Sequence, residues 1–128
     1  MAREALLGRV PIPGPQVHPL RTPDVELPGR FDLVLLGIGA DGHTASLFPG
    51  DPVLEVTNRP VVRVERPDHP RLTLTYPVID GARVVAFLVA GADKREILAC
   101  VLAGDRSLPA ARVRAEETYV LADTAAAP

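Results

Sequence analysis

A histidine directly follows a glycine-rich turn at the end of an apolar run. The turn, residues 37–42 (GIGADG), contains three glycines, which allow the backbone to approach a ligand closely and whose amides can form an anion-binding nest. His43 comes next, and histidine suits proton transfer because its unperturbed pKa is about 6.5. Asp41, two residues earlier, is placed to fix the tautomer of the imidazole and to stabilise its protonated form. The pattern predicts general base or acid chemistry on a water molecule, with Asp41 and His43 as the catalytic pair.

Two other interpretations of this turn are open. Its glycines match the formal G-x-G-x-x-G dinucleotide pattern, which needs a covering helix after the loop and an acid after the next strand. Glu65 supplies such an acid, but residues 44–48 run directly into the sequence PGDP, and so short a segment does not make that helix. The remaining interpretation is a plain tight turn in which His43 is a surface histidine.

The sequence does not indicate covalent or metal chemistry beside His43. No serine or cysteine has the flanking glycines of a nucleophile elbow. No set of ligands with zinc spacing accompanies the histidine. We therefore expect neither a metal nor a cofactor.

Lys94 is the only lysine among the fourteen basic residues, the others being arginine. It follows a predicted central strand and begins a predicted helix, where the partial positive charge and free amides of the helix terminus favour an anion. Lys94 is therefore a candidate phosphate ligand. The alternative is a solvated helix residue.

We expect an open α/β sheet to position these residues. An almost unbroken apolar run at residues 31–38 predicts a strand buried on both faces of a parallel sheet, and residues 83–90 predict a second central strand. A buried strand followed by a glycine turn and a helix occurs twice, which is typical of a mostly parallel sheet with flanking helices, Rossmann-like in part. The whole chain, 1–128, is expected to form one domain. The other expected elements are a helix over 2–10, strands over 17–20, 59–65, 71–75 and 118–121, a helix over 94–102, and a frayed tail over 123–128.

Composition limits the class of partner. The chain has 128 residues, of which 47% are hydrophobic and 23% charged, as in a single globular domain. A net charge of −2 and the lack of a basic cluster argue against nucleic acid, and no apolar run approaches the length of a membrane span. The single cysteine, Cys100, excludes an internal disulfide, so we expect a cytoplasmic location. His18 and His69 lie among prolines and arginines and are expected to be surface residues.

Two segments carry a resemblance to a known enzyme family. Residues 32–50 (DLVLLGIGADGHTASLFPG) and 71–98 (RLTLTYPVIDGARVVAFLVAGADKREIL) resemble the 6-phosphogluconolactonases, in the superfamily that also contains glucosamine-6-phosphate deaminase. The resemblance implies the fold of that superfamily. It also implies hydrolysis of 6-phosphoglucono-1,5-lactone to 6-phosphogluconate in the pentose phosphate pathway, without a cofactor.

The resemblance assigns roles to individual residues. It implies that His43 activates water for attack on the lactone carbonyl and that Lys94 contacts the substrate phosphate. Arg71, which opens the strand RLTLT, matches an arginine of the family that also faces the phosphate, with Arg63 and Arg66 as nearby alternatives. The glycines expected to line the substrate site are Gly37, Gly39 and Gly42.

One position separates this chain from the deaminases of the superfamily. They resemble the turn as far as the histidine but carry a glutamate five residues later, where this chain has Phe48. An aromatic side chain cannot polarise an imidazole, so a deaminase-like isomerase is the weaker alternative. A non-catalytic sugar-phosphate-binding module is a further alternative.

The resemblance covers the C-terminal half of the family's pattern. The family's Gly-Gly-Ser/Thr phosphate loop and its Asp-Glu-Arg motif, which lie upstream, have no counterpart in this sequence. We therefore expect a truncated chain whose activity alone is an open question. We also expect apolar sheet surface exposed where further strands would pack, and self-association through that surface.

Overall fold

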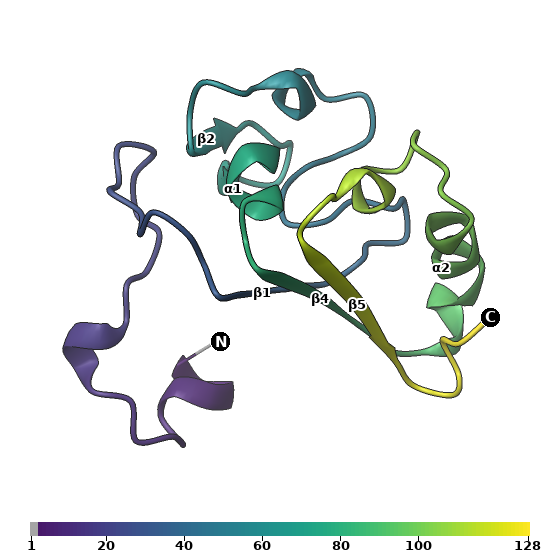
Figure 1. Ribbon diagram of the computed structural model, residues 1–128, viewed down its shortest axis with the longest axis horizontal. Helices are drawn as coiled ribbons and strands as arrows, with labels where there is room; N and C mark the ends of the chain where they lie inside the picture. Colours follow the sequence, from purple (N-terminus) through teal and green to yellow (C-terminus); the bar gives the residue numbers. More distant parts are fainter. Residues whose placement is uncertain (1–2) are drawn as a thin grey trace.

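The computed structural model describes residues 3–128, which form a three-stranded sheet, a separate two-stranded hairpin and two helices (Figure 1). The strands are β1 Leu33–Leu36, β2 Val61–Val64, β3 Arg71–Leu74, β4 Val84–Val89 and β5 Glu117–Ala122, and the helices are α1 Tyr76–Asp80 and α2 Arg95–Leu102. Short 3-10 or π-helical turns occupy Arg3–Leu7, Gly14–Gln16, Pro52–Glu55, Ala92–Lys94 and Pro109–Arg112.

The three-stranded sheet is parallel, with the strand order β1–β4–β5. Leu36 of β1 lies opposite Phe87 of β4, and Phe87 lies opposite Val120 of β5. Because the strands run in one direction, the turns that follow β1 and β4 meet at the same edge of the sheet, where ligands bind in open α/β folds. The predicted parallel α/β sheet, with β4 as a central strand, is confirmed.

The two faces of this sheet differ in exposure, because successive side chains of a strand point to opposite faces. On one face, Val85 and Phe87 are at most 2% exposed and belong to the same apolar core as Leu98 of α2. Burial of one such side chain stabilises the fold by roughly 1.5–3 kcal/mol. The opposite face, called here the open sheet face, carries large apolar side chains that are at least half exposed: Leu33, Leu35, Leu88, Tyr119 and Leu121.

The prediction that the first central strand is buried on both faces is wrong. Leu33 and Leu35 are 51% and 56% exposed, whereas Val34 between them is 8% exposed. The exposure alternates because the apolar core, which includes Leu98 of α2, lies against one face of the sheet only. The apolar sheet surface expected from the sequence is therefore present on this face.

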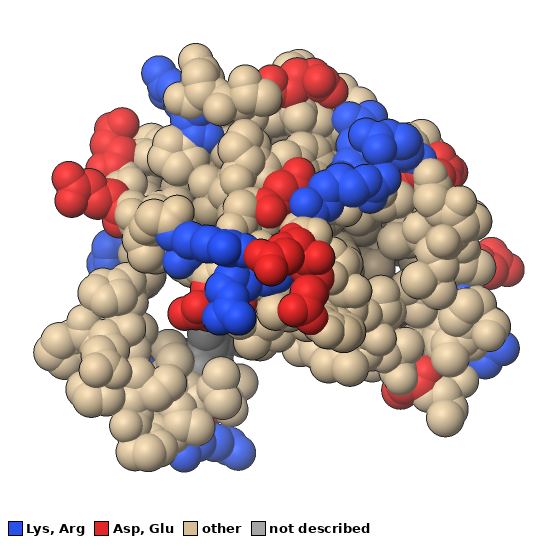
Figure 2. Space-filling model, in the orientation of Figure 1, with Lys and Arg blue, Asp and Glu red and all other residues tan. Residues whose placement is uncertain are grey.

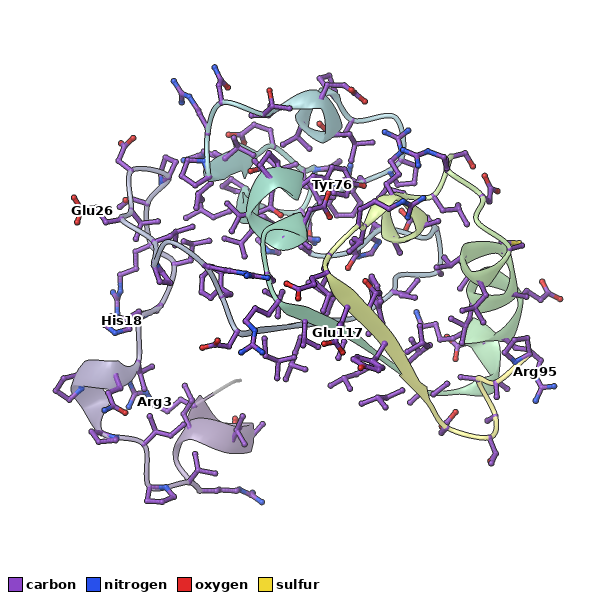
Figure 3. All side chains as sticks on the ribbon, in the orientation of Figure 1. Arg3, His18, Glu26, Tyr76, Arg95 and Glu117 are labelled. Carbon is purple, nitrogen blue, oxygen red and sulfur yellow. The ribbon has the colours of Figure 1, made fainter. Side chains whose placement is uncertain are left out.

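Strands β2 and β3 form an antiparallel hairpin apart from the central sheet, which confirms the strands predicted over 59–65 and 71–75. Helix α1 follows β3 and was not predicted. Pro77 stands in its first turn, where proline is tolerated because the N–H has no helical partner. Tyr76, labelled in Figure 3, links α1 to a distant turn, since its hydroxyl donates to the carbonyl of Pro109 at 2.8 Å. Burial raises the pKa of Tyr76 to about 12.

Residues 3–20 form an arm that extends away from the sheet (Figure 1), and none of them is buried. The helix predicted over 2–10 is reduced to one π-helical turn, Arg3–Leu7, and its residue 2 lies outside the described residues. The strand predicted over 17–20 is wrong. This segment pairs with no described strand, and its Pro19 has no N–H to donate to a ladder.

The C-terminal residues, for which we expected fraying, make defined contacts. The carboxylate of Asp123 accepts the backbone N–H of Ala126 at 2.7 Å and that of Gly91 at 3.1 Å. Arg95 of α2 donates to the carbonyls of residues 124 and 125, and Ala126 is fully buried. The tail is thereby held against the start of α2 instead of fraying.

Candidate active site

The glycine turn closes on itself directly after β1. The amide of Gly39 donates to the carbonyl of His43 at 2.8 Å, and the amide of Gly42 donates to the carbonyl of Gly39 at 2.9 Å. Thr44, which is fully buried, donates its hydroxyl to the carbonyl of Gly37 at 2.9 Å. These bonds hold His43 at the carboxyl edge of the parallel sheet.

The three turn glycines have different structural roles. A Cβ on Gly39 would lie 2.1 Å from Cε1 and Nδ1 of the His43 ring, far inside van der Waals contact, so the imidazole occupies the space that a side chain would need. Gly42 has a φ of +79°, and a Cβ there would lie 2.8 Å from Leu108. Gly37 has open space in the direction of a Cβ. Glycine is therefore needed at two of these positions for the shape of the turn.

Asp41 contacts the imidazole of His43 from within the same turn. Nδ1 of His43 and Oδ1 of Asp41 are 2.5 Å apart, and the same oxygen accepts the backbone N–H of His43 at 3.1 Å. Partial burial raises the pKa of Asp41, but hydrogen bonds and charge from His43 outweigh it, so the pKa of this carboxyl lies below its ordinary value of 3.8. An ionised Asp41 accepts a hydrogen bond from Nδ1–H, which leaves Nε2 with a free lone pair. The arrangement is that of a histidine base with a carboxylate partner.

The ring of Phe48 packs against the imidazole of His43. Its ring centroid lies 4.5 Å from that of His43 at an interplanar angle of 36°, and Phe48 is 5% exposed. The residue that separates this chain from the deaminases in sequence thus contacts His43 in space. Because a phenyl ring exchanges no proton, Asp41 is the acidic partner of the histidine in this turn.

Lys94 lies at the same edge of the sheet, in the turn that follows β4. It ends the 3-10 turn Ala92–Lys94 and directly precedes α2, as predicted. Gly91, with a φ of +99°, opens this turn, and the hydrogen bonds from its amide to Asp123 tie the turn to the end of β5. Because β1 and β4 are parallel neighbours, the turn that carries Lys94 and the turn that carries His43 leave the same edge.

Arg71 and Arg66 both approach the ring of Phe48. The guanidinium carbon of Arg71 is 5.6 Å from the ring centroid, and Nη2 of Arg71 donates to Asp68 at 2.6 Å. Arg66, an alternative named from the sequence, is nearer, with its guanidinium carbon 3.9 Å from the centroid. Arg63 of β2, the other alternative, forms an ion pair with Glu65, which directly follows the strand. The sequence did not predict that Phe48 lies between His43 and two of these arginines, Arg66 and Arg71, with its ring near all three side chains.

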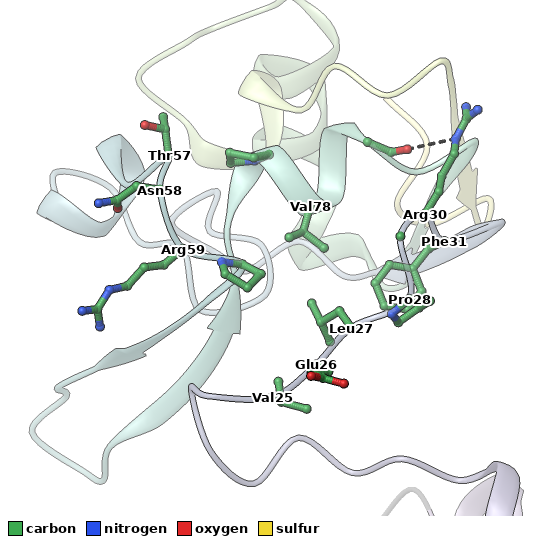
Figure 4. Close-up of a pocket in the computed structure, with 14 residues that line it drawn as sticks. Val25, Glu26, Leu27, Pro28, Arg30, Phe31, Thr57, Asn58, Arg59 and Val78 are labelled. Atoms are coloured by element: carbon green, nitrogen blue, oxygen red, sulfur yellow. Dashed lines mark hydrogen bonds between the residues drawn. The ribbon is translucent and has the colours of Figure 1, made fainter.

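One hollow among the described residues lies away from this site. It has a volume of about 620 Å³ and is enclosed by the loop before β1, the loop before β2 and α1, with Phe31 and Val78 among its walls (Figure 4). None of the predicted site residues lines it. A smaller hollow of about 350 Å³ adjoins His43 and is lined by Gly37 and Gly39. We place the candidate active site at the smaller hollow, because it adjoins the histidine and its carboxylate partner.

Other candidate features lie outside this site. Among residues 3–128, no group of three or more His, Cys, Asp or Glu side chains is arranged to hold a metal ion. Within that range, no helix has the length and apolar character that crossing a membrane requires.

The other two histidines lie away from the site. His18 lies on the arm, apart from the sheet (Figure 3), and His69 is in an exposed loop beside Asp68. On the face drawn in Figure 2, basic and acidic side chains are interleaved.

Comparison with known proteins connects this geometry to a family. The family model described as glucosamine-6-phosphate isomerases/6-phosphogluconolactonase matches residues 1–121. The 6-phosphogluconolactonase of a Synechocystis species is 42% identical over 124 residues, covering 80% of this chain and 52% of that protein. The solved structure of a devB protein has a TM-score of 0.82 at 27% identity, covering 98% of this chain and 63% of that one. The 6-phosphogluconolactonase structure from Thermotoga maritima has a TM-score of 0.64 at 35% identity, covering 74% and 44%. The chain spans about half the length of the curated relatives it matches.

Proposed function

Because this chain belongs to the glucosamine-6-phosphate isomerase/6-phosphogluconolactonase family, we propose that it hydrolyses 6-phosphoglucono-1,5-lactone to 6-phosphogluconate. The observation that carries the proposal is the 2.5 Å contact between His43 and Asp41, at the carboxyl edge of the parallel sheet. We place the reaction in the cytoplasm, because a phosphorylated sugar is charged and a lipid interior excludes charge.

In the proposed reaction His43 is the general base. Asp41 accepts a hydrogen bond from Nδ1–H, so Nε2 takes a proton from water while the water oxygen attacks the lactone carbonyl. The tetrahedral intermediate collapses as the bond between the carbonyl carbon and the ring oxygen breaks. The imidazolium then returns its proton to that oxygen, which becomes a hydroxyl group. One water is consumed, and the carboxylic acid product releases its proton to solvent.

Lys94 and Arg71 supply the positive charge for the substrate phosphate in this proposal. Lys94 is supported by its place before α2, where the helix terminus also favours an anion. Arg71 is supported by its approach to Phe48, the ring that packs on the histidine. Of the turn glycines, we assign Gly37 to substrate contact, because its surroundings are open.

The alternatives make different predictions. A deaminase-like isomerase is less well supported, because a phenyl ring contacts His43 at the position where that branch of the family has an acid. A non-catalytic sugar-phosphate-binding module retains the phosphate contacts but does not use the histidine as a base. It would bind 6-phosphogluconate without accelerating lactone hydrolysis.

The proposal is tested by lactone hydrolysis measured against the spontaneous rate. We expect the wild-type chain to exceed this background and His43→Ala to fall to it. His18→Ala, a histidine on the exposed arm, is the matched control and should retain wild-type activity. Equal rates for wild type and His43→Ala would refute the enzyme assignment for this chain, and binding of 6-phosphogluconate in that case would identify the non-catalytic module.

We also propose that copies of this chain associate through the open sheet face. Its side chains are apolar and half exposed, which is uncommon for a surface that faces water alone, and a second copy presents the same face around a twofold axis. In light scattering, the wild type should form dimers or larger species. The double variant Leu35→Lys, Leu121→Lys should be monomeric, whereas Leu102→Lys, equally exposed but on α2, should behave as the wild type. A monodisperse wild-type monomer that binds little hydrophobic dye would contradict the proposal.

A further inference from the structure

We propose that Arg66 is an anion-binding residue of the candidate active site and that, together with Arg71, it receives the phosphate group of the substrate. The identity of the anion rests on the proposed function. The position and charge of Arg66 do not, and they carry the inference that an anion binds here.

Arg66 is connected to His43 through a single buried ring. Its guanidinium carbon lies 3.9 Å from the centroid of Phe48, and the Phe48 centroid lies 4.5 Å from that of the imidazole. A guanidinium that stacks on an aromatic ring uses its flat face for that contact. The N–H groups at its edge point away from the ring and stay available as hydrogen-bond donors. Phe48, at 5% exposure, thus holds a cation beside the catalytic candidate.

The charge of Arg66 is uncompensated, in contrast to that of its neighbours. Arg63 pairs with Glu65 at 2.5 Å, and Arg71 pairs with Asp68 at 2.6 Å. Among the described residues, no carboxylate lies within 4.0 Å of a nitrogen of Arg66.

Two guanidinium groups therefore approach the ring of Phe48. Among the described residues only that of Arg71 pairs with a carboxylate, Asp68, whose side chain is about half exposed. A phosphate accepts several hydrogen bonds at once and matches the fork of a guanidinium. An anion bound by both arginines would share Arg71 with Asp68 and would supply the partner that Arg66 lacks. Such an anion would lie next to the ring that contacts His43, which fits a substrate whose reacting carbon and phosphate belong to one small molecule.

A role for Arg66 in covering Phe48 alone predicts a different response to substitution. Packing depends on the length of the side chain, whereas anion binding depends on its charge. Arg66→Gln removes the charge, Arg66→Lys keeps it, and Arg63→Gln removes the charge of a neighbouring arginine that is already paired. These three variants separate the two roles.

The test is titration of the wild-type chain with inorganic phosphate, 6-phosphogluconate and gluconate, followed through the NMR signals of the His43 imidazole and the Phe48 ring. We expect saturable shifts with the two phosphates. Arg66→Gln should weaken both by about tenfold, as expected for the loss of one charge-assisted contact. Arg66→Lys should retain most of the affinity, Arg63→Gln should match the wild type, and gluconate should not distinguish the variants.

Three results would overturn the inference: no saturable phosphate binding by the wild type, affinity of Arg66→Gln within twofold of the wild type, or equal weakening for gluconate and 6-phosphogluconate. Failure of the proposed function is distinguishable from these. Arg66-dependent phosphate binding without lactone hydrolysis would leave the anion site standing and refute the enzyme. Lactone hydrolysis by the wild type, with an unchanged KM in Arg66→Gln, would support the enzyme and refute the anion site.

Discussion

Replacing Gly39 with alanine is the sharpest perturbation that the site offers, because it moves His43 without removing any polar group. The added methyl carbon would lie 2.1 Å from Cε1 and Nδ1 of the imidazole. Real Cβ contacts essentially never fall below 3.0 Å, so either the ring or the backbone has to shift by on the order of 1 Å. The ring is the movable partner, since the turn's backbone is held by its own hydrogen bonds.

A displacement of this size is large for a catalytic group. Misplacement by about 1 Å costs roughly 100-fold in rate, since catalysis depends on aligned reacting atoms. The same movement disturbs the 2.5 Å contact of Nδ1 with Asp41. We therefore expect kcat/KM for lactone hydrolysis to fall about 100-fold in Gly39→Ala, while the free energy of unfolding changes by no more than about 1 kcal/mol.

The assay is lactone hydrolysis corrected for the spontaneous rate, together with the NMR signals of the His43 ring. Ala40→Gly is the matched control, because it makes the same turn more flexible at an exposed residue without adding an atom beside the ring, and it should stay within a few fold of the wild type. Gly39→Ala with wild-type activity and unshifted ring signals would refute the reasoning. Equal losses in both variants would also refute it, because they would point to the flexibility of the turn instead of the placement of the ring.

Three further predictions concern stability. Gly42→Ala should lower the free energy of unfolding by about 1–3 kcal/mol more than Gly50→Ala in chemical denaturation, because both positions have positive φ but only at Gly42 would a Cβ meet Leu108, at 2.8 Å; equal losses would contradict this. Tyr76→Phe should lose about 1 kcal/mol at neutral pH, since the carbonyl that Tyr76 binds loses its donor. Burial raises the pKa of Tyr76 from 10.0 to about 12, so the wild type should lose stability as the pH rises through this interval, where the unfolded chain ionises first, and Tyr76→Phe should lack that decline in thermal unfolding. Burial also raises the pKa of Asp80. Asp80→Asn, which keeps an acceptor for the backbone amide of Arg114, should therefore be slightly more stable than the wild type at neutral pH. This advantage should shrink as the pH falls and Asp80 itself becomes neutral, and a stability difference that stays constant with pH would count against the burial argument.

Local patterns predicted those parts of the fold that depend on neighbouring residues alone. The continuous apolar run at 83–90 became the central strand β4, and the alternating segment at 59–65 became β2. The strand predicted at 17–20 was wrong, because a strand also requires a partner with free hydrogen-bonding groups. The helix α1 was not predicted because its five residues carry no helical repeat. It is stabilised by packing and by the contact of Tyr76 with a turn more than thirty residues away.

The order of the amino acids was enough to identify the side chains available for chemistry: a histidine after a glycine turn, an aspartate two residues before it, and a lysine at the start of a helix. It also indicated the family, because the turn and the segment around Lys94 are distinctive. Three-dimensional packing was needed to show that Asp41 bonds the imidazole as well as the backbone, that Gly39 leaves room for the ring, and that Arg66 stacks on the ring of Phe48 beside the histidine. The open sheet face belongs with these, since apolar strands look alike whether one face is covered or both are. Such contacts depend on how the hairpin, the turn and α2 pack in three dimensions, and neither spacing nor periodicity along the chain encodes that packing.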